Sequence, residues 1–344
     1  MNLSVLDLVP LSTGQTSADA IAASLTSAEL ADSLGYTRYW FAEHHNMTAF
    51  AATAPPIMVA LAASRTGRIR VGAGGVMLPN HSPLIVAEQF AALEAAFPNR
   101  IDLGLGRAPG SDPGITALLR STGPVSDPGS FPRHVAEIAA LVGTEPVGFS
   151  TGNGEYRVRA TPAPAGRVPV WMLGSSPSSA TLAAQLGLPY AFAHHIVPAA
   201  AEQAISLYRE SFVPSAELDR PRVLMTSHIS VGETRSEAER RALPTLASFQ
   251  RLQRGLPSTI FDTIQEVEST GVSAVARLAA EPIRQDWIID SVDGASARLR
   301  ELAERFEVDE VMLVPLPARF DSDPIDRMPV RDFVLESMAK ELLG

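Results

Sequence analysis

Glu43, His44 and His45 carry the side chains of this chain that are best suited to acid–base chemistry. The sequence holds seven histidines in 344 residues, and this adjacent pair directly follows an acid. The unperturbed pKa of imidazole lies near neutrality, so a histidine at the end of a strand can accept or release a proton at working pH. A purely structural role, in which the two histidines only hydrogen-bond to loop backbone, fits these residues equally well. Neighbouring side chains point in different directions and no HExxH spacing is present, so no metal site is predicted.

Two further groups have the chemistry of an anion site. Arg107 follows an expected strand, and its planar guanidinium suits phosphate. Residues 174–179, Gly-Ser-Ser-Pro-Ser-Ser, precede an expected helix, where hydroxyls, free backbone N–H groups and the helix dipole attract anions. Taken singly, Arg107 fits a salt bridge at the rim of the fold, and Ser176 before Pro177 fits an ordinary helix cap. Together the two groups favour a phosphate-bearing ligand without identifying it.

Glycines interrupt an expected strand at Gly72, Gly74 and Gly75. Because glycine weakens a strand, its presence needs a reason, such as a bulge or a flat ligand that approaches the backbone. A kink in the strand is the alternative, and the run does not open a helix as a dinucleotide fingerprint would. His195 ends another strand and is expected at the same end of the fold. His228 lies inside a strand and is interpreted as a core residue.

Beta-rich runs alternate with helical patterns along the chain, which is typical of parallel βα units. The expected strands are residues 3–9, 38–42, 69–77, 100–105, 168–173, 190–194, 222–231 and 310–314. Eight such units predict a closed (β/α)₈ TIM barrel in a single domain of residues 1–344, with an open doubly wound sheet as the alternative. In a barrel the C-terminal ends of the strands meet at one mouth, so the groups described above would share it.

Two long stretches without a clear periodicity follow expected strands, residues 106–132 and residues 256–293. The second forms an extended loop insertion between the seventh and eighth units. Loops at this end of a barrel usually shape or cover the active site, so we expect these two to determine the substrate. Neither contains a readable motif.

The composition excludes several classes of function. A net charge of −10 argues against nucleic acid or an anionic membrane surface as the main partner. The chain has no cysteine, which excludes disulfides, thiolate metal sites and iron–sulfur clusters. The first residues lack the basic region and cleavage site of a signal peptide, and no apolar run is long enough to span a bilayer. A soluble, cytoplasmic protein is therefore expected.

Five sequence blocks resemble one known family in order and spacing. They are LVPLSTGQT, LGYTRYWFAEHHNM, VGAGGVMLPNHSPL, FPNRIDLGLGRAPG and SSPSSATLAAQLGLPYAFAHH. Over nearly its whole length the chain resembles the bacterial-luciferase-like flavin monooxygenases, most closely their single-chain FMN-type branch. The resemblance implies a (β/α)₈ barrel, usually a homodimer, with reduced FMN at the mouth. It also implies a separate flavin reductase as partner, O₂ as co-substrate and a small organic substrate, an aldehyde-like one among the candidates.

The resemblance also implies roles for single residues. His44 falls on the family's catalytic histidine and His45 on its neighbour. Gly74-Gly75 falls on a non-prolyl cis peptide that supports the flavin ring. The positions expected to hold the FMN phosphate are Arg107, Arg133, Ser176 and Ser179, with Ser175 beside them. Met77 and His195 are expected to line the substrate side.

The chain departs from the luciferase pattern at three places. Gly106 stands where the luciferase chain has a reactive cysteine beside the flavin, and Ser175 replaces an acid near the phosphate. The loop of residues 256–293 does not resemble luciferase's mobile lid. Light emission and an aldehyde substrate are therefore not carried over. An F420-dependent hydride transferase and a non-catalytic flavin-binding protein remain alternatives, although the retained histidine pair argues against the second.

Overall fold

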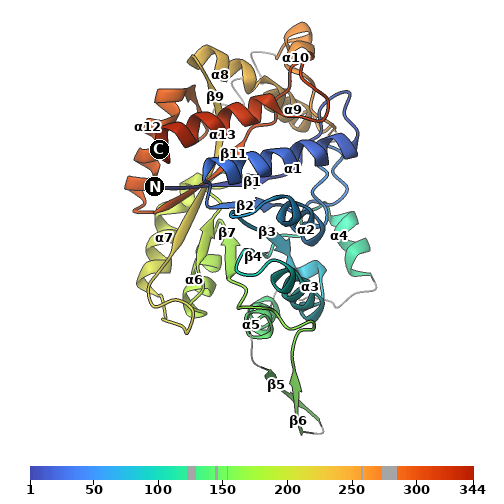
Figure 1. Cartoon of the computed structure of the whole chain (residues 1–344), viewed down its shortest axis with the longest axis vertical. Helices are drawn as coiled ribbons and strands as arrows, with labels where there is room; N and C mark the ends of the chain where they lie inside the picture. Colours follow the sequence, from blue (N-terminus) through green and yellow to red (C-terminus); the bar gives the residue numbers. More distant parts are fainter. Residues whose placement is uncertain (122–128, 144–145, 153, 257–258, 273–284) are drawn as a thin grey trace.

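Parallel strands form a closed barrel in the computed structural model of the chain (Figure 1). The structure describes residues 1–121, 129–143, 146–152, 154–256, 259–272 and 285–344. In order around the barrel, its strands are β1 (Asn2–Asp7), β2 (Arg38–Phe41), β3 (Arg70–Met77), β4 (Ile101–Gly106), β7 (Val170–Gly174), β8 (Tyr190–Phe192), β9 (Val223–Gly232) and β11 (Glu310–Pro315). The ring closes because β8 pairs with β9, β9 with β11 and β11 with β1. The predicted (β/α)₈ barrel is therefore confirmed.

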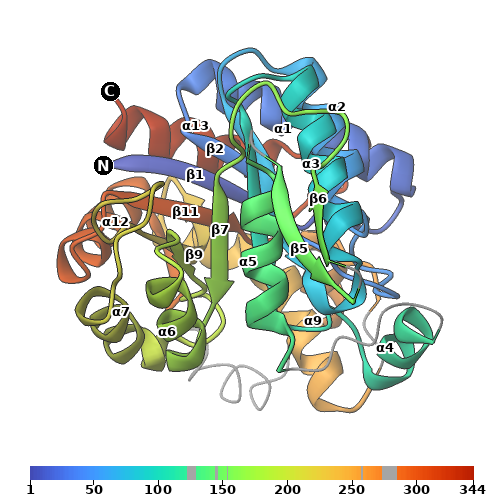
Figure 2. The ribbon, with the colours of Figure 1, turned by 90° about the horizontal axis from the view of Figure 1, so that it is seen from below.

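Helices that connect the strands cover the outside of the barrel. Figure 2, turned by 90°, shows α5, α6, α7 and α12 around β7, β9 and β11. The covering helices are α1 (Ser17–Leu34), α2 (Pro55–Arg65), α3 (Pro83–Ala96), α5 (Phe131–Leu141), α6 (Pro177–Gln185), α7 (Ala201–Glu210), α12 (Val292–Arg305) and α13 (Pro329–Leu342). None of the helices described is long and apolar enough to cross a membrane.

Both stretches predicted to lack regular structure contain short elements. In the first, Asp112 caps α4 (Pro113–Arg120) by accepting hydrogen bonds from the N–H groups of Gly114 and Ile115. In the second, a capping box of Thr263 and Glu266 starts a helix. The second stretch holds α10 (Ile264–Thr270) and strand β10 (Ile288–Ser291), which extends the sheet beside β9, while α8 (Arg235–Arg241) and α9 (Leu243–Gln253) lie between β9 and this stretch. The parts of these predicted loops at residues 122–128, 257–258 and 273–284 lie outside the described residues.

A hairpin between β4 and β7 was missed by the sequence analysis. Strands β5 (Val147–Thr151) and β6 (Gly154–Val158) pair with each other and extend away from the barrel (Figure 1). The side chains of β6 are mostly exposed, so the continuous hydrophobic run of a buried parallel strand is missing from this segment.

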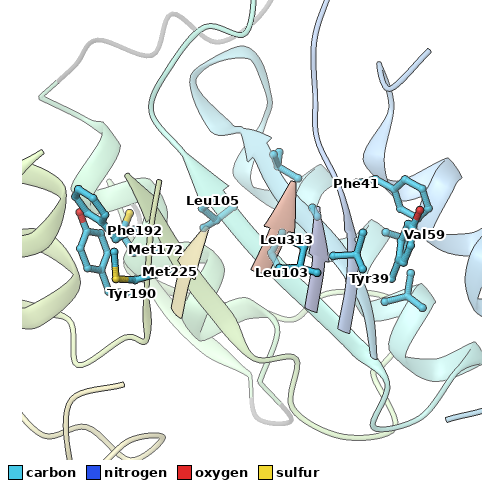
Figure 3. Close-up of a cluster of buried hydrophobic side chains, with 14 of the residues drawn as sticks. Tyr39, Phe41, Val59, Leu103, Leu105, Met172, Tyr190, Phe192, Met225 and Leu313 are labelled. Carbon is cyan, nitrogen blue, oxygen red and sulfur yellow. The ribbon is translucent and has the colours of Figure 1, made fainter. Parts of the chain in front are cut away.

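Alternation along β2 separates the core into two layers. Tyr39 and Phe41 point outward and pack with Val59 of α2, as Figure 3 shows. Trp40, between them, points into the barrel and meets Trp171 edge to face, with ring centroids 5.5 Å apart. Successive side chains of a strand face opposite sides, so β2 contributes to both layers. The same alternation continues after Phe41, so the side chains of Glu43 and His45 point one way and that of His44 points the other way.

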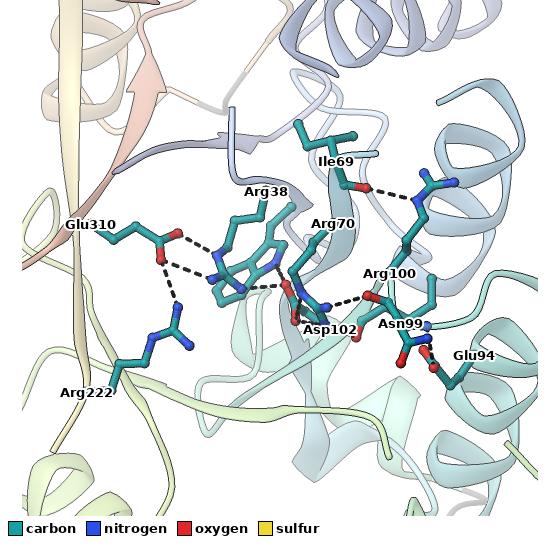
Figure 4. A network of polar contacts seen from close by, with 11 residues as sticks. Arg38, Ile69, Arg70, Glu94, Asn99, Arg100, Asp102, Arg222 and Glu310 are labelled. Carbon is teal, nitrogen blue, oxygen red and sulfur yellow. Dashed lines mark hydrogen bonds and ion pairs between the residues drawn. The ribbon is translucent and has the colours of Figure 1, made fainter. Parts of the chain in front are cut away.

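Charged side chains fill the N-terminal end of the barrel (Figure 4). Arg38 donates from Nη1 to Asp102 at 2.7 Å and from Nε to Glu310 at 2.5 Å, and all three side chains are buried. Its guanidinium also lies over the ring of Trp171, 4.7 Å from the centroid. These residues stand first or second in their strands, so the ion pairs form the floor of the barrel and its C-terminal end remains for a ligand.

Replacing Arg38 with alanine should lower the free energy of unfolding by about 3–5 kcal/mol, because it leaves the carboxylates of Asp102 and Glu310 buried without a shared cation. Urea denaturation followed by circular dichroism measures the change. Arg65→Ala is the matched control, since the Arg65–Glu29 pair is exposed and should contribute less than about 1 kcal/mol. Equal losses in the two variants would contradict the assignment of the ion network as a structural floor.

Candidate functional site

A cavity of about 610 Å³ lies at the C-terminal mouth of the barrel. That volume is within the range of small-molecule and cofactor sites. Most of the residues predicted for the site line it together: His44, Gly74, Gly75, Met77, Arg107, Ser175, Ser176, Ser179 and His195. Its other walls are largely apolar, and they include Leu6, Trp40 and Met312. Residues far apart in the sequence therefore meet in one apolar pocket that has few polar groups.

His44 lines this pocket with its imidazole ring, one nitrogen of which has no partner among the described residues. Its backbone N–H donates to the carbonyl of Ala52, and its ring packs on Phe50 with centroids 5.5 Å apart. Its Nδ1 atom is buried and has no hydrogen-bond partner in the part of the chain that the structure describes. Burial lowers the pKa of His44, against an opposing effect of the Glu43 carboxylate. A neutral imidazole at a cavity wall can bind or transfer a proton of a ligand.

Glu43 turns away from His44 and joins two other histidines. Its buried Oε1 lies 2.8 Å from Nε2 of His45 and 2.7 Å from Nε2 of His81, and its Oε2 accepts the backbone N–H of Met77 at 2.9 Å. Burial would raise the pKa of Glu43, but hydrogen bonds from His81 and His45 hold it below its usual value. As a carboxylate, Glu43 can only accept, so both imidazoles donate to it.

This Glu43–His45–His81 cluster was not predicted as a unit. Its ligand atoms lie within 4.8 Å of one another, close enough for a shared metal ion, but hydrogen bonds already join the three side chains. The alternation of side chains after β2 could have indicated that Glu43 and His45 point the same way and His44 the other way. The contact with His81 is long-range in sequence and had no such signal.

Glycine is required at the flat wall of the cavity. A Cβ atom on Gly75 would lie 2.7 Å from the carbonyl oxygen of Gly104, and one on Gly74 would lie 2.6 Å from Leu6. The Gly74-Gly75 peptide is cis, as the family resemblance implied. The register of β3 and β4 shifts between Ala73 and Val76, so the strand bulges where it borders the cavity.

The serine cluster starts α6 at the rim of the cavity. Ser176 caps the helix and forms a capping box with Ser179, as its position before Pro177 predicted. Ser179 Oγ lies 3.0 Å from the hydroxyl of Tyr190, and Arg107 Nη2 donates to Ser178 at 3.4 Å. Hydroxyls, helix N–H groups and an exposed guanidinium thus lie together, which is the chemistry of an anion site.

Two predicted site residues do not line this cavity. Arg133 is on the exposed side of α5 and pairs with Glu137 at 2.6 Å. His45 is held by Glu43 and donates its backbone N–H to the carbonyl of Gly110. Their roles toward a cofactor stay predictions.

His228 was interpreted as a core residue, and that interpretation was wrong. Leu224, Thr226 and His228 are alternate residues of β9 and all face the inside of the barrel. The last two line the cavity beside His195, and the ring centroids of His195 and His228 are 5.0 Å apart. Period-two alternation starting from Leu224 would have placed His228 at the mouth.

The comparison with protein families agrees with this geometry. The model of the luciferase-like monooxygenases matches residues 1–308. The chain belongs to this family. It is 43% identical over 265 residues to a luciferase-like monooxygenase of Escherichia coli K12, covering 77% of each chain, and 38% identical over 311 residues to the uncharacterized protein YvbT of Bacillus subtilis, covering 90% of each. The solved structure of apo-MsnO8 is similar with a TM-score of 0.86 at 33% identity, covering 99% of this chain and 98% of that one.

Two solved structures of lower sequence identity share the fold and differ in cofactor. The oxygenating constituent of 3,6-diketocamphane monooxygenase, solved in complex with FMN, has a TM-score of 0.74 at 16% identity and covers 99% of this chain and 98% of its own. An F420-dependent secondary alcohol dehydrogenase has a TM-score of 0.67 at 16% identity and covers 98% of both chains. The same fold thus occurs with either cofactor.

Proposed function

We propose that this luciferase-like monooxygenase uses reduced FMN and O₂ to oxygenate a small organic substrate. The observation that carries the proposal is the convergence, in one cavity, of the His44 imidazole, a glycine wall and a hydroxyl-rich anion site. Bound FMN, when reduced, would supply the electrons that activate O₂.

The residues present fit this cofactor. The wall at Gly74 and Gly75 carries no side chain and suits a flat ring, while Ser176, Ser179 and Arg107 suit its phosphate. Apolar walls would exclude water from the reacting groups. His44 would hold or move a proton at its imidazole, since its lowered pKa keeps the ring neutral and able to accept one.

F420-dependent hydride transfer is the second candidate, and the F420-dependent relative with the same fold favours it. Apo-protein should be mixed separately with photoreduced FMN and reduced F420, with retention measured by gel filtration and O₂ uptake by electrode. We expect FMN to be retained and O₂ to be consumed with oxygenated product from a substrate panel. Retention of F420 with no O₂ uptake would replace the first candidate with the second. Flavin retention without product from any substrate would favour a binding protein.

Arg107→Ala should weaken FMN binding about tenfold, because a charge-assisted contact to the phosphate is lost. Riboflavin lacks the phosphate and serves as the matched ligand, so its Kd should change less than about twofold. Quenching of flavin fluorescence gives both constants. Equal weakening for the two flavins would show that Arg107 supports the pocket without binding phosphate.

We also propose a homodimer and a separate reductase that supplies reduced FMN. Exposed apolar side chains on α2 and α3 favour a second copy as the partner of this face, because Ile57 is 62% exposed and Ile85 52%. Sedimentation should give twice the chain mass, and Ile57→Glu should shift it toward the monomer. An unchanged dimer in that variant would place the interface elsewhere.

A further inference from the structure

His195 and His228 both line the cavity, yet the proposed oxygenation assigns no chemistry to them. Their rings meet at 82° with centroids 5.0 Å apart, and the ring of His228 also packs on Trp287. The neighbouring walls, such as Leu173 and Met312, are apolar. The pair is therefore a polar feature in a largely apolar part of the pocket.

The hydrogen bonds of His228 fix which of its nitrogens carries the proton. Its Nδ1 lies 3.4 Å from the carbonyl oxygen of Val314 in the adjacent strand β11. A carbonyl oxygen can only accept, so Nδ1 is the protonated nitrogen and Nε2 carries a lone pair. Burial lowers the pKa of His228 to about 4, so the ring stays neutral near pH 7.

His195 has the same tautomer for a related reason. Its Nδ1 lies 2.5 Å from the hydroxyl oxygen of Thr226, and that hydroxyl donates its proton to the carbonyl of Phe192 at 3.3 Å. We assign the hydroxyl proton of Thr226 to the Phe192 carbonyl, so that the hydroxyl accepts from His195 Nδ1 and Nε2 is left as an acceptor. Burial, and next the nearby imidazole of His228, hold the pKa of His195 well below its usual value.

Both Nε2 atoms thus remain as acceptors. Neither has a hydrogen-bond partner among the residues that the structure describes, and both rings line the cavity. We propose that His195 and His228 form an acceptor pair that selects a substrate bearing an O–H or N–H donor. This inference rests on the proposed function for the reaction itself, and it names the substrate class of the same pocket.

The inference changes the expectation of an aldehyde-like substrate. An aldehyde or ketone offers only an acceptor, so its carbonyl would face two lone pairs and leave them unpaired. A site built to pair with a hydroxyl or amide N–H rejects analogues that lack it, because its own polar groups then lose their partners. An alcohol, an oxime, an acid amide or a phenol would satisfy the pair.

The tautomers can be measured without cofactor or turnover. In a ¹⁵N-histidine-labelled protein, long-range ¹H–¹⁵N spectra distinguish a protonated nitrogen from one with a lone pair. We expect protonated Nδ1 and bare Nε2 in both rings near pH 7, with assignments from His195→Asn and His228→Asn. A protonated Nε2 in either ring would overturn the acceptor pair. Because the measurement needs no flavin, its outcome is independent of whether the proposed oxygenation is correct.

A pair of isomers tests recognition directly. 1-Octanol and 1-methoxyheptane contain the same atoms but differ in the O–H donor, and calorimetry can compare their Kd values on protein with and without oxidised FMN. We expect the alcohol to bind about threefold to tenfold more tightly, as one net hydrogen bond allows. His228→Asn keeps an amide N–H near Val314 but removes the Nε2 acceptor, so the preference should shrink toward unity.

His194→Asn is the matched control for that variant, because His194 lies next to His195 but lines a different hollow. The preference for the alcohol should persist in this control. Equal affinity of the wild-type protein for the two isomers would overturn the proposal. So would a preference that survives in the double variant His195→Asn/His228→Asn.

Discussion

Replacing His44 with alanine should lower the rate of substrate oxygenation about 100-fold to 10,000-fold, the range that one general acid–base group contributes. The Kd for FMN should change less than about twofold, because the glycine wall and the anion site are untouched. Single-turnover oxygenation with pre-reduced FMN measures the first quantity, and flavin fluorescence measures the second. A loss of flavin binding equal to the loss of rate would mean that His44 supports the pocket and does not act on protons.

The pH dependence separates these roles further. Burial lowers the pKa of His44, so the neutral ring should persist below the ordinary imidazole range. If His44 acts as a base, kcat/KM should stay constant on lowering the pH through 6.5 and fall only below that value. This acidic limb should be absent in His44→Ala. His194→Ala changes a histidine outside the cavity lining and should retain the limb.

The barrel could be predicted because each of its strands carries local signals. In β2, the run Tyr39-Trp40-Phe41 after Arg38 is aromatic and short, and the structure has the strand at Arg38–Phe41. The sequence predicts such runs well because buried parallel strands are continuously hydrophobic. The hairpin β5–β6 has mostly exposed side chains in β6, so the same signal was missing there.

The sequence predicted those site residues that stand in an unusual local sequence pattern. Gly74 and Gly75 are unusual inside a strand, and Ser176 before Pro177 is a recognisable helix start; both lie at the cavity. His228 was missed because a lone histidine inside a strand is usually core, and only its register with Leu224 reveals the inward direction. Long-range contacts such as the one between Glu43 and His81 form only in the closed barrel, so no pattern in the neighbouring sequence indicates them.

Glu43→Gln should lower kcat/KM for oxygenation about 10-fold to 100-fold, the usual effect of removing a supporting group behind a site, because Glu43 holds the backbone of the cavity residue Met77 and lies beside His44. The amide replaces one acceptor by a donor, so it must face either the Met77 N–H or the two imidazole N–H groups unfavourably. Stopped-flow single-turnover kinetics measure the rate, and thermal unfolding measures the accompanying loss of stability.

The control for Glu43→Gln is Glu94→Gln, since Glu94 is also buried and accepts a backbone N–H, from Asn99, outside the cavity lining. That control should lose stability but not rate. The carboxylate of Glu43 raises the pKa of His44 against the larger effect of burial, so removing the charge should shift the acidic limb of kcat/KM to lower pH. A limb that stays in place while the rate falls would show that Glu43 holds β3 and the loop together without acting through His44.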